Sequence, residues 1–305
     1  MKVLVTGGAG FIGSHIAQHF SEQGAEVVVY DNLRTGFEKN IKPFNVKFVK
    51  ASVTELDKLK EAMKGVDYVF HLAALISVPE SLEKPIETEI INTQGTINVL
   101  EAAKENGVKK VVLSSSAAIY GDNPVLPKKE DMLPEPKSPY AVSKLSGEYY
   151  LALYRQAFGV PTASVRYFNV FGDRQDPNSQ YAAAIPIFVK KAVTNEDIVI
   201  FGDGEQTRDF VFVKEVVKAN VLVAEKGDSV YNVALGNKIT INELAEKIIK
   251  MTNSKSKIKY APERPGDIKH SRADISKIKS LGFEPSYDFD EALKITIEYF
   301  QKIYG

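Results

Sequence analysis

The chain begins Met1-Lys2-Val3-Leu4-Val5-Thr6-Gly7-Gly8-Ala9-Gly10-Phe11-Ile12-Gly13, and this stretch decides the fold. Its apolar start predicts a strand over Lys2–Thr6, and the spacing that follows predicts a helix over Phe11–Gln23. The glycines satisfy Gly-x-Gly-x-x-Gly at positions 8, 10 and 13, and Gly-x-x-Gly-x-x-Gly at positions 7, 10 and 13. A strand, a glycine turn and a helix N-terminus together form a site for the pyrophosphate of a dinucleotide. The contacts are expected from Gly7, Gly10, Phe11, Ile12 and Gly13.

A second predicted strand, Glu26–Asp31, ends in an acidic residue about 20 residues after the glycines, as dinucleotide-binding folds require. A carboxylate at this position binds the hydroxyls of the adenosine ribose and repels a 2′-phosphate. Asp31 therefore predicts NAD rather than NADP as the cofactor, and Asn32 is expected to add a contact. Arg34 is the opposing argument, but one arginine does not cancel a carboxylate on the ribose.

The rest of the chain divides into two parts. Up to about residue 168, strands are expected at Val46–Val49, Tyr68–His71, Lys110–Ser114 and Thr162–Arg166, and helices at Glu55–Met63, Thr88–Glu105 and Tyr140–Phe158. This alternation predicts an α/β fold with a Rossmann-type doubly wound parallel sheet. Beyond Asn169, loops rich in Asp, Gly, Asn and Pro separate short elements, which indicates a smaller α/β substrate-binding lobe. We expect residues 1–168, plus about 209–236, to bind NAD, and residues 169–208 and 237–305 to form the lobe.

The composition of the chain excludes several classes of protein. Its 305 residues include 39 Lys and Arg and 39 Asp and Glu, a balance that predicts neither a nucleic-acid nor an anionic membrane partner. It has no cysteine, which excludes disulfides and thiolate chemistry. The glycines from Gly7 onward interrupt the apolar start too early for a signal peptide, so a cytoplasmic location is expected. His15 and His19 are spaced i, i+4 but lack the glutamate of a zinc motif, and no metal site is predicted.

Tyr140 and Lys144 lie four residues apart at a predicted helix start. Ser138 is a favourable N-cap and Pro139 suits the first helical position, so the two side chains share one face of the helix. A free phenol has a pKa of about 10, but a neighbouring ammonium and a helix N-terminus favour the phenolate. Ser116, at the end of the preceding strand, is expected to hydrogen-bond the reacting oxygen. A phenol, an ammonium and a hydroxyl beside nicotinamide can move a hydride and a proton together.

Further motifs follow in order along nearly the whole chain. They are His71-Leu72-Ala73-Ala74, Asn92-Thr93-Gln94-Gly95-Thr96, Ser114-Ser115-Ser116-Ala117-Ala118-Ile119-Tyr120-Gly121, Arg166-Tyr167-Phe168-Asn169-Val170-Phe171-Gly172, Gly202-Asp203-Gly204, Arg208-Asp209-Phe210 and Arg264-Pro265-Gly266-Asp267. With these motifs the chain resembles the extended short-chain dehydrogenase/reductase family, and most closely the UDP-sugar 4-epimerases.

The resemblance implies an enzyme that keeps NAD bound. Tyr140 takes the proton from the sugar O4 while the C4 hydride passes to nicotinamide; the 4-keto sugar then turns about its pyrophosphate, and the hydride returns to the other face. Further NAD contacts are implied at Ser52, Val53, Leu72, Ala73, Ala74, Ser114, Tyr140, Lys144 and Tyr167. Contacts to the UDP-sugar are implied at Ser116, Tyr140, Asn169, Ala184, Phe201, Arg208, Arg264, Asp267 and Ser271. A homodimer is also implied, with apolar area from Tyr149, Tyr150, Leu153 and Tyr154.

Ser271 is expected to set the size of the sugar pocket. Family members limited to UDP-glucose and UDP-galactose carry a tyrosine seven residues after the position of Arg264, whereas members that accept N-acetylated sugars carry a small residue. Ser271 is small, so the pocket should admit a 2-acetamido group, a difference worth about 1–3 kcal/mol. The expected substrates are UDP-N-acetylglucosamine and UDP-N-acetylgalactosamine, together with UDP-glucose and UDP-galactose.

The same residues bear on alternative functions. A sugar-nucleotide 4,6-dehydratase needs an acid/base pair, which its family members carry as Asp-Glu after the catalytic hydroxyl; Ala117 and Ala118 argue against it. A UDP-glucuronate 4-epimerase remains an alternative, because arginines that bind a diphosphate can also bind a uronate. Another extended short-chain dehydrogenase acting on a nucleotide sugar is a further alternative. A nucleotide-sensing module on an inactive fold would be expected to lose Tyr140 or Lys144.

Overall fold

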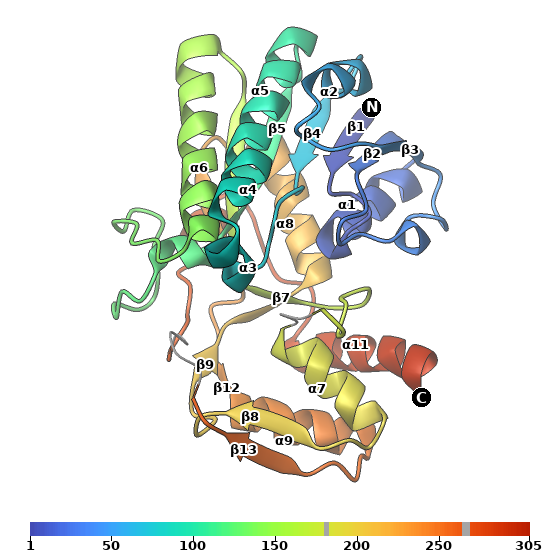
Figure 1. Cartoon of the computed structure of the whole chain (residues 1–305), viewed down its shortest axis with the longest axis vertical. Helices are drawn as coiled ribbons and strands as arrows, with labels where there is room; N and C mark the ends of the chain where they lie inside the picture. Colours follow the sequence, from blue (N-terminus) through green and yellow to red (C-terminus); the bar gives the residue numbers. More distant parts are fainter. Residues whose placement is uncertain (180–182, 264–268) are drawn as a thin grey trace.

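A sheet of seven parallel strands forms the centre of the computed structural model, which describes residues 1–179, 183–263 and 269–305 (Figure 1). The strands are β1 (Lys2–Thr6), β2 (Glu26–Asp31), β3 (Lys47–Lys50), β4 (Tyr68–His71), β5 (Lys110–Ser116), β6 (Thr162–Tyr167) and β11 (Val230–Val233). Their order is β11-β6-β5-β4-β1-β2-β3, and every pair is parallel. The predicted doubly wound sheet is therefore confirmed.

Helices cover both faces of this sheet because the strands are apolar on both sides. One face carries α1 (Phe11–Glu22) and α8 (Val213–Lys226), whose apolar side chains pack on Val3, Val5, Val27 and Val29. The other face carries α2 (Leu56–Ala62), α5 (Gly95–Asn106) and α6 (Pro139–Phe158), which pack on Leu4, Val28, Val69 and Val111. Ser138 caps α6 as predicted, accepting from Ala141 N–H at 3.2 Å, and Pro139 is the first helical residue.

The helix predicted over Thr88–Glu105 is present, but it begins earlier and contains a π-helical turn. The structure has α3 (Val78–Glu83), α4 (Pro85–Glu89), a π-helical turn η2 (Ile90–Gln94) and then α5. Within η2, the side-chain amide of Asn92 accepts from Leu75 N–H and donates to the Leu75 carbonyl oxygen. Such π turns occur often at functional sites. Two short 3₁₀ turns, η1 (Glu38–Asn40) and η3 (Ala117–Tyr120), complete this part of the chain.

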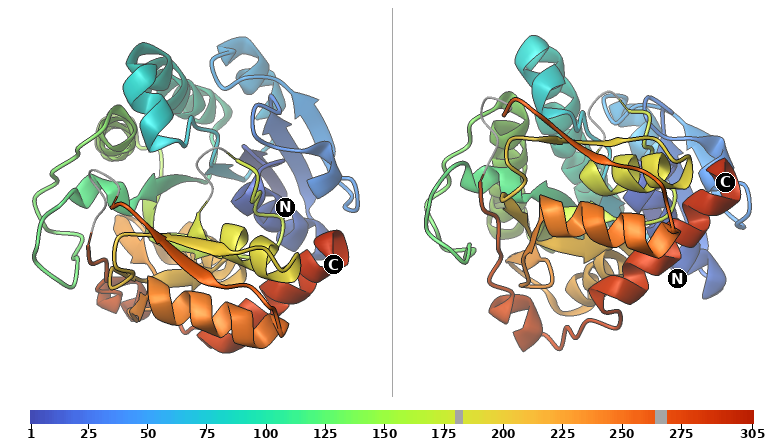
Figure 2. Two further views of the ribbon diagram at one scale, coloured as in Figure 1. Left: turned by 60° about the horizontal axis from the view of Figure 1, so that its bottom comes forward. Right: turned by 90° about the horizontal axis from the view of Figure 1, so that it is seen from below.

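The remaining elements form a smaller lobe below the sheet, seen from two further directions in Figure 2. Its strands pair as β7 (Asn169–Phe171) with β10 (Phe210–Phe212), β8 (Ile198–Phe201) with β13 (Ile258–Ala261), and β9 (Thr207–Arg208) with β12 (Ile239–Thr240). Its helices are α7 (Ala184–Val193), α9 (Ile241–Thr252) and α11 (Phe289–Tyr304), which share a hydrophobic cluster with these strands. The prediction of short elements is wrong for α9 and α11, because both are amphipathic helices of 12 and 16 residues.

The chain between α9 and α11 returns to the main sheet. Ala273, Ile275, Ile278 and Phe283 pack in the same cluster as α1 and α8, around the short helix α10 (Ser276–Ser280). Within the described ranges, no helix combines the length and apolar character that crossing a membrane requires. The strand order reverses between β1 and β4, and ligands of such sheets bind at the carboxyl ends of the strands beside this reversal.

Candidate active site

The glycine loop between β1 and α1 is packed so closely that it excludes side chains. Gly7 has φ +67°, and a Cβ there would lie 2.7 Å from Ala73 N; a Cβ on Gly13 would lie 2.2 Å from the Gly7 carbonyl oxygen. Gly10 is the N-cap of α1, and no side chain of the described residues caps this helix end. The first N–H groups of α1 are thus suited to an anionic ligand. The other predicted contacts, Phe11 and Ile12, form the first turn.

Asp31 ends β2 as predicted, beside the glycine loop. Its Oδ2 accepts from Ala9 N–H at 2.9 Å and its Oδ1 from Leu33 N–H at 2.7 Å. Burial raises the pKa of this carboxyl group above its ordinary value, while the two backbone hydrogen bonds act in the opposite direction. The backbone therefore fixes the carboxylate in one orientation, as a group that binds ribose hydroxyls must be fixed.

Arg34 and Asn32 lie in the exposed loop after β2. Asn32 Oδ1 accepts from Arg34 N–H at 3.1 Å, so it shapes this loop. The guanidinium of Arg34 forms ion pairs with Glu80 at 2.8 Å and with Glu87 at 2.6 Å. These pairs engage the one side chain that favours NADP in the sequence, and they strengthen the choice of NAD.

The segment after β4 lies against the glycine loop through Thr6. The Thr6 hydroxyl accepts from the N–H groups of Leu72 at 3.1 Å and Ala73 at 3.2 Å, and it contacts His71 Nδ1 at 2.7 Å. His71 Nε2 contacts Thr96 Oγ1 at 3.0 Å. Burial lowers the pKa of His71 to about 3, so this histidine is neutral and structural. Ala74 follows, partly buried, in the same segment.

Two predicted cofactor contacts have side chains that serve packing. Val53 is buried, and its Cγ2 would lie 2.6 Å from a Cβ on Gly95, so it fills the space this glycine leaves. The hydroxyl of Tyr167 donates to Asn220 Oδ1 at 2.9 Å, on α8. A cofactor contact from Tyr167 would therefore come from the ring or the main chain. Ser52 shapes the loop after β3, where its Oγ accepts from the N–H of residue 54 at 3.3 Å.

The three predicted catalytic residues lie where α6 faces the end of β5. β5 runs to Ser116, two residues further than predicted. Lys144 is buried, and its Nζ donates to the carbonyl oxygen of Ser114 at 2.8 Å. Ser116 hydrogen-bonds the hydroxyl of Tyr140, and its Oγ accepts from Ala118 N–H at 3.1 Å. The structure therefore brings the phenol, the ammonium and the serine together.

The expected lowering of the pKa of Tyr140 is not found in the protein alone. Burial raises the pKa of Tyr140 above its ordinary value, and the hydrogen bond from Ser116 opposes this effect only in part. Burial also lowers the pKa of Lys144 to about 8. Desolvation disfavours the charged form of both groups, and the Lys144 Nζ lies 5.8 Å from the centre of the Tyr140 ring.

A buried ion pair connects the catalytic helix to the sheet, and the sequence did not reveal it. Glu148 follows Lys144 by one turn, and Arg166 of β6 binds it through two hydrogen bonds, Nε–Oε1 at 2.9 Å and Nη2–Oε2 at 2.7 Å. Ser115 donates to Glu148 Oε1 at 2.6 Å. Arg166 Nη1 also donates to the hydroxyl of Tyr120 at 2.9 Å. The helix and the strand that carry the catalytic groups are thus held in one register.

Asn92 is a site residue to which the sequence reasoning assigned no role. Its Oδ1 accepts from Leu75 N–H at 2.7 Å, and its Nδ2 donates to Leu75 O at 3.0 Å and to Ser143 Oγ at 2.9 Å. It therefore ties the segment after β4 to the residue beside Lys144. An asparagine inside a helical pattern, where its propensity is low, was the available signal.

The lobe residues predicted to bind substrate are organised around Asp209. Asn169 opens β7, and both its N–H and its Nδ2 donate to the Asp209 carbonyl oxygen at 3.2 Å. The Asp209 carboxylate accepts from Leu235 N–H at 3.2 Å and Ala273 N–H at 3.1 Å. Burial raises the pKa of Asp209 to about 6. One buried side chain thus joins three segments that border the lobe.

Arg208 and Ser271 lie on neighbouring segments. Thr207 N–H donates to Lys269 O at 2.9 Å, and Ser271 N–H donates to Thr207 O at 3.1 Å. This pairing brings the predicted size-determining residue beside the predicted phosphate ligand. Phe201 ends β8 and Ala184 begins α7. The predicted contacts Arg264 and Asp267 lie outside the described residues.

Comparisons with known proteins agree with this geometry. Residues 3–234 match the model of the NAD dependent epimerase/dehydratase family. The chain is 40% identical over 299 residues to a putative UDP-glucose 4-epimerase of Methanocaldococcus jannaschii, with 97% of each chain covered. It superimposes with a TM-score of 0.96 on the UDP-N-acetylglucosamine 4-epimerase from Methanobrevibacter ruminantium in complex with UDP-N-acetylmuramic acid (46% identity, 99% and 98% covered). It also superimposes, with a TM-score of 0.92, on the UDP-glucose 4-epimerase of Thermus thermophilus in complex with NAD (36% identity, 99% of each covered).

Proposed function

The chain belongs to the NAD-dependent epimerase/dehydratase family, and from this premise we propose that it reversibly inverts C4 of UDP-hexoses with tightly held NAD. The observation that supports the proposal best is the meeting of Tyr140, Lys144 and Ser116 at the end of β5. The relatives named as UDP-sugar 4-epimerases match over nearly the full chain, so they share the lobe as well as the sheet.

The described residues fit NAD. The uncapped N-terminus of α1 after the closely packed glycine loop suits a pyrophosphate, and the fixed carboxylate of Asp31 suits the adenosine ribose. Lys144, held by a strand carbonyl, is placed to bind the nicotinamide ribose. When bound, NAD supplies a hydride acceptor and a positively charged ring, whose charge lowers the pKa of a neighbouring phenol.

The chain's own residues then handle the proton of the sugar. Ser116 accepts a hydrogen bond from the backbone at its Oγ, so its single O–H is directed to other partners, Tyr140 or the sugar O4. Tyr140 removes the O4 proton when C4 is oxidised and returns it when C4 is reduced. The ammonium of Lys144 stabilises the phenolate form of Tyr140 whenever the phenol is without its proton.

The residues after Ser116 favour epimerisation over elimination of water. Ala117 and Ala118 form the turn η3 directly after the serine. Neither side chain can give or take a proton, whereas a 4,6-dehydratase needs an acid and a base beside the keto sugar. The proposed reaction therefore stops at the 4-keto stage and reverses.

Substrate choice belongs to the lobe, to which we assign residues 169–208 and 237–305, and we assign residues 1–168 with about 209–236 to NAD binding. Two segments cross this division, because β10 pairs with β7 of the lobe and the segment of residues 273–283 packs against the main sheet. Arg208 suits a diphosphate because its guanidinium can donate two parallel hydrogen bonds. Ser271, held beside Arg208, leaves room for a 2-acetamido group. The proposed substrates are UDP-N-acetylglucosamine and UDP-N-acetylgalactosamine as well as UDP-glucose and UDP-galactose.

One assay with two enzymes tests the assignment. Purified wild-type protein and Ser271→Tyr are each supplied with UDP-glucose, UDP-N-acetylglucosamine and UDP-glucuronate, and the C4 epimers are separated by chromatography. We expect wild type to convert the first two, and Ser271→Tyr to lose about 10- to 200-fold in kcat/KM for the acetamido sugar alone. Equal losses for both sugars would refute the role of Ser271, and conversion of UDP-glucuronate alone would refute the substrate assignment.

The same proposal includes a homodimer through α6. Val142, Tyr149 and Leu153 are 42%, 62% and 49% exposed, whereas Tyr154 is buried and supports the core instead. Ile86, in the adjoining α4, is 76% exposed. An outward apolar stripe on two neighbouring helices is typical of a subunit interface. Sedimentation of wild type and Leu153→Glu tests it, since the variant should be monomeric.

A further inference from the structure

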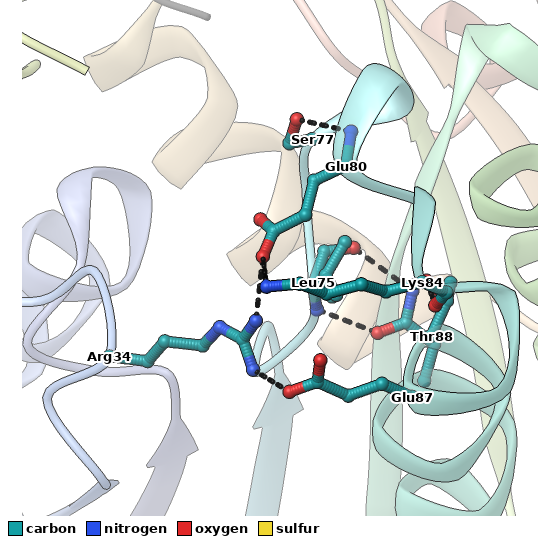
Figure 3. A network of polar contacts seen from close by, with 8 residues as sticks. Arg34, Leu75, Ser77, Glu80, Lys84, Glu87 and Thr88 are labelled. Carbon is teal, nitrogen blue, oxygen red and sulfur yellow. Dashed lines mark hydrogen bonds and ion pairs between the residues drawn. The ribbon is translucent and has the colours of Figure 1, made fainter. Parts of the chain in front are cut away.

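Arg34, in the loop after β2, contacts side chains of the two short helices that follow β4 (Figure 3). Its Nη1 donates to Glu87 Oε1 at 2.6 Å and its Nη2 to Glu80 Oε1 at 2.8 Å, so two carboxylates share one guanidinium. Glu80 belongs to α3 and Glu87 to α4, far from Arg34 in the sequence. No local turn explains these contacts, and they depend on the tertiary fold.

The position of these contacts follows from the strand order. Arg34 follows β2, α3 and α4 follow β4, and β1 lies between β2 and β4 in the sheet. A link from one side to the other therefore passes above the carboxyl end of β1, where the glycine loop lies. We propose that Arg34, Glu80 and Glu87 form a clasp over the bound dinucleotide that keeps it in place throughout the catalytic cycle. This inference rests on the proposed function, because a cofactor reduced and reoxidised within one turnover must not leave.

Glu80 is diverted from another role to make this contact. Ser77 caps α3 by accepting from Glu80 N–H at 3.1 Å, and in the spacing Ser-x-x-Glu the glutamate ordinarily bonds back to the N-cap N–H. Thr240 and Glu243 form this reciprocal pair in full at α9. At α3, the Glu80 carboxylate instead faces Arg34 and Lys84 Nζ, the latter at 3.0 Å. Arg34, which is distant in sequence, has replaced the local N-cap as the partner of this carboxylate.

The far end of the clasp is attached to the catalytic helix. α4 leads directly into the π turn η2, from which Asn92 reaches both Leu75 and Ser143. The Arg34 and Glu87 side chains are 32% and 43% exposed, so their pairing is accessible to salt. Ion pairs of this exposure are weak singly and are screened by added electrolyte. The clasp should therefore open more often at high ionic strength.

Exchange of labelled NAD measures the clasp directly. Holoenzyme loaded with labelled NAD is mixed with excess unlabelled NAD, without sugar, and the label that remains bound is followed by rapid filtration. We expect Arg34→Gln and the double variant Glu80→Gln/Glu87→Gln to release NAD about 5- to 30-fold faster than wild type. Arg34→Lys keeps the charge but cannot reach two carboxylates with one fork, so it should be intermediate.

Salt and a matched control complete the design. Raising salt from about 0.05 M to about 1 M should speed release from wild type and leave the double variant unchanged. Lys60→Gln removes an ion pair to Glu105 (2.6 Å) that links α2 and α5, and it should leave release unchanged. Thermal unfolding in saturating NAD checks that each variant is folded.

Two results would overturn the clasp. One is release at the wild-type rate from both Arg34→Gln and the double variant at each salt concentration. The other is exchange of NAD from the wild-type protein that is complete within the mixing time, because no clasp would then retain the cofactor. The exchange assay contains no sugar, so it tests the clasp independently of the epimerase assignment. The UDP-sugar assay tests that assignment.

Discussion

Replacing Glu148 with Gln should destabilise the protein more than the loss of one hydrogen bond can explain. The side chains of Glu148 and Arg166 are each 4% exposed, and the carboxylate receives Nε at 2.9 Å and Nη2 at 2.7 Å. Gln keeps the shape but turns an amide NH₂ toward one of these donors. The guanidinium then keeps its charge in the interior without a carboxylate, with neutral acceptors that include the hydroxyl of Tyr120 and a carbonyl oxygen. Removing one partner of such a pair costs about 3–5 kcal/mol.

Urea unfolding followed by circular dichroism, at one fixed NAD concentration, measures this cost. We expect Glu148→Gln to lower the free energy of unfolding by about 3–5 kcal/mol, and Ser115→Ala by about 1 kcal/mol, because it removes one hydrogen bond (2.6 Å) and leaves no charge unpaired. The double variant Glu148→Leu/Arg166→Met removes both charges and should recover most of the loss.

Catalysis provides a second measurement on the same variants. Glu148 shares its helix face with Tyr140 and Lys144, and Ser115 lies between the two serines they contact. A shift of α6 against β5 should therefore reduce kcat by about 10- to 100-fold with little change in KM. The reasoning is refuted if Glu148→Gln costs less than about 1 kcal/mol, or if the double variant is no more stable than the single one.

Three other predictions concern the site itself. Tyr140→Phe should reduce kcat by at least about 100-fold while NAD stays bound, whereas Tyr154→Phe, which removes a hydroxyl from the same helix, should not; turnover and bound NAD are measured together. Gly13→Ala should weaken NAD binding because its Cβ would overlap a carbonyl oxygen of the loop, and equal affinity by calorimetry would contradict this packing. Lys144 has a pKa of about 8 when folded, below its ordinary value, so the unfolded chain binds its proton more tightly. The stability of wild type relative to Lys144→Met should therefore rise from about pH 8 to about pH 10.5, and a flat difference in urea midpoints would exclude the shift.

The strands could be predicted from the sequence because their signal is local. Glu26–Asp31 and Tyr68–His71 are continuous apolar runs with polar neighbours, and the structure reproduces both to the residue. The helix over Thr88–Glu105 was predicted, but its π-helical turn was not. Asn92 lies in this turn and bonds Leu75, a contact between segments that the local pattern does not report.

In the site, too, the local features could be predicted from the sequence and the tertiary contacts could not. Spacing alone placed Tyr140 and Lys144 on one helix face and gave α6 its cap. The directions of their pKa shifts could not be predicted, because burial, which no spacing reports, disfavours the charged form of both groups. The partners of Glu148 and Arg34 were missed for a similar reason, since each contact joins elements distant in sequence.

The lysine contact with Ser114 is made by a carbonyl oxygen, an atom that every amino acid provides. Point substitutions at position 114 therefore leave the acceptor itself in place, provided the strand keeps its course. An insertion or deletion within Lys110–Ser116, by contrast, would present a different main-chain atom to the ammonium. For the position of the Lys144 ammonium, the length of this strand should therefore matter more than the identity of residue 114.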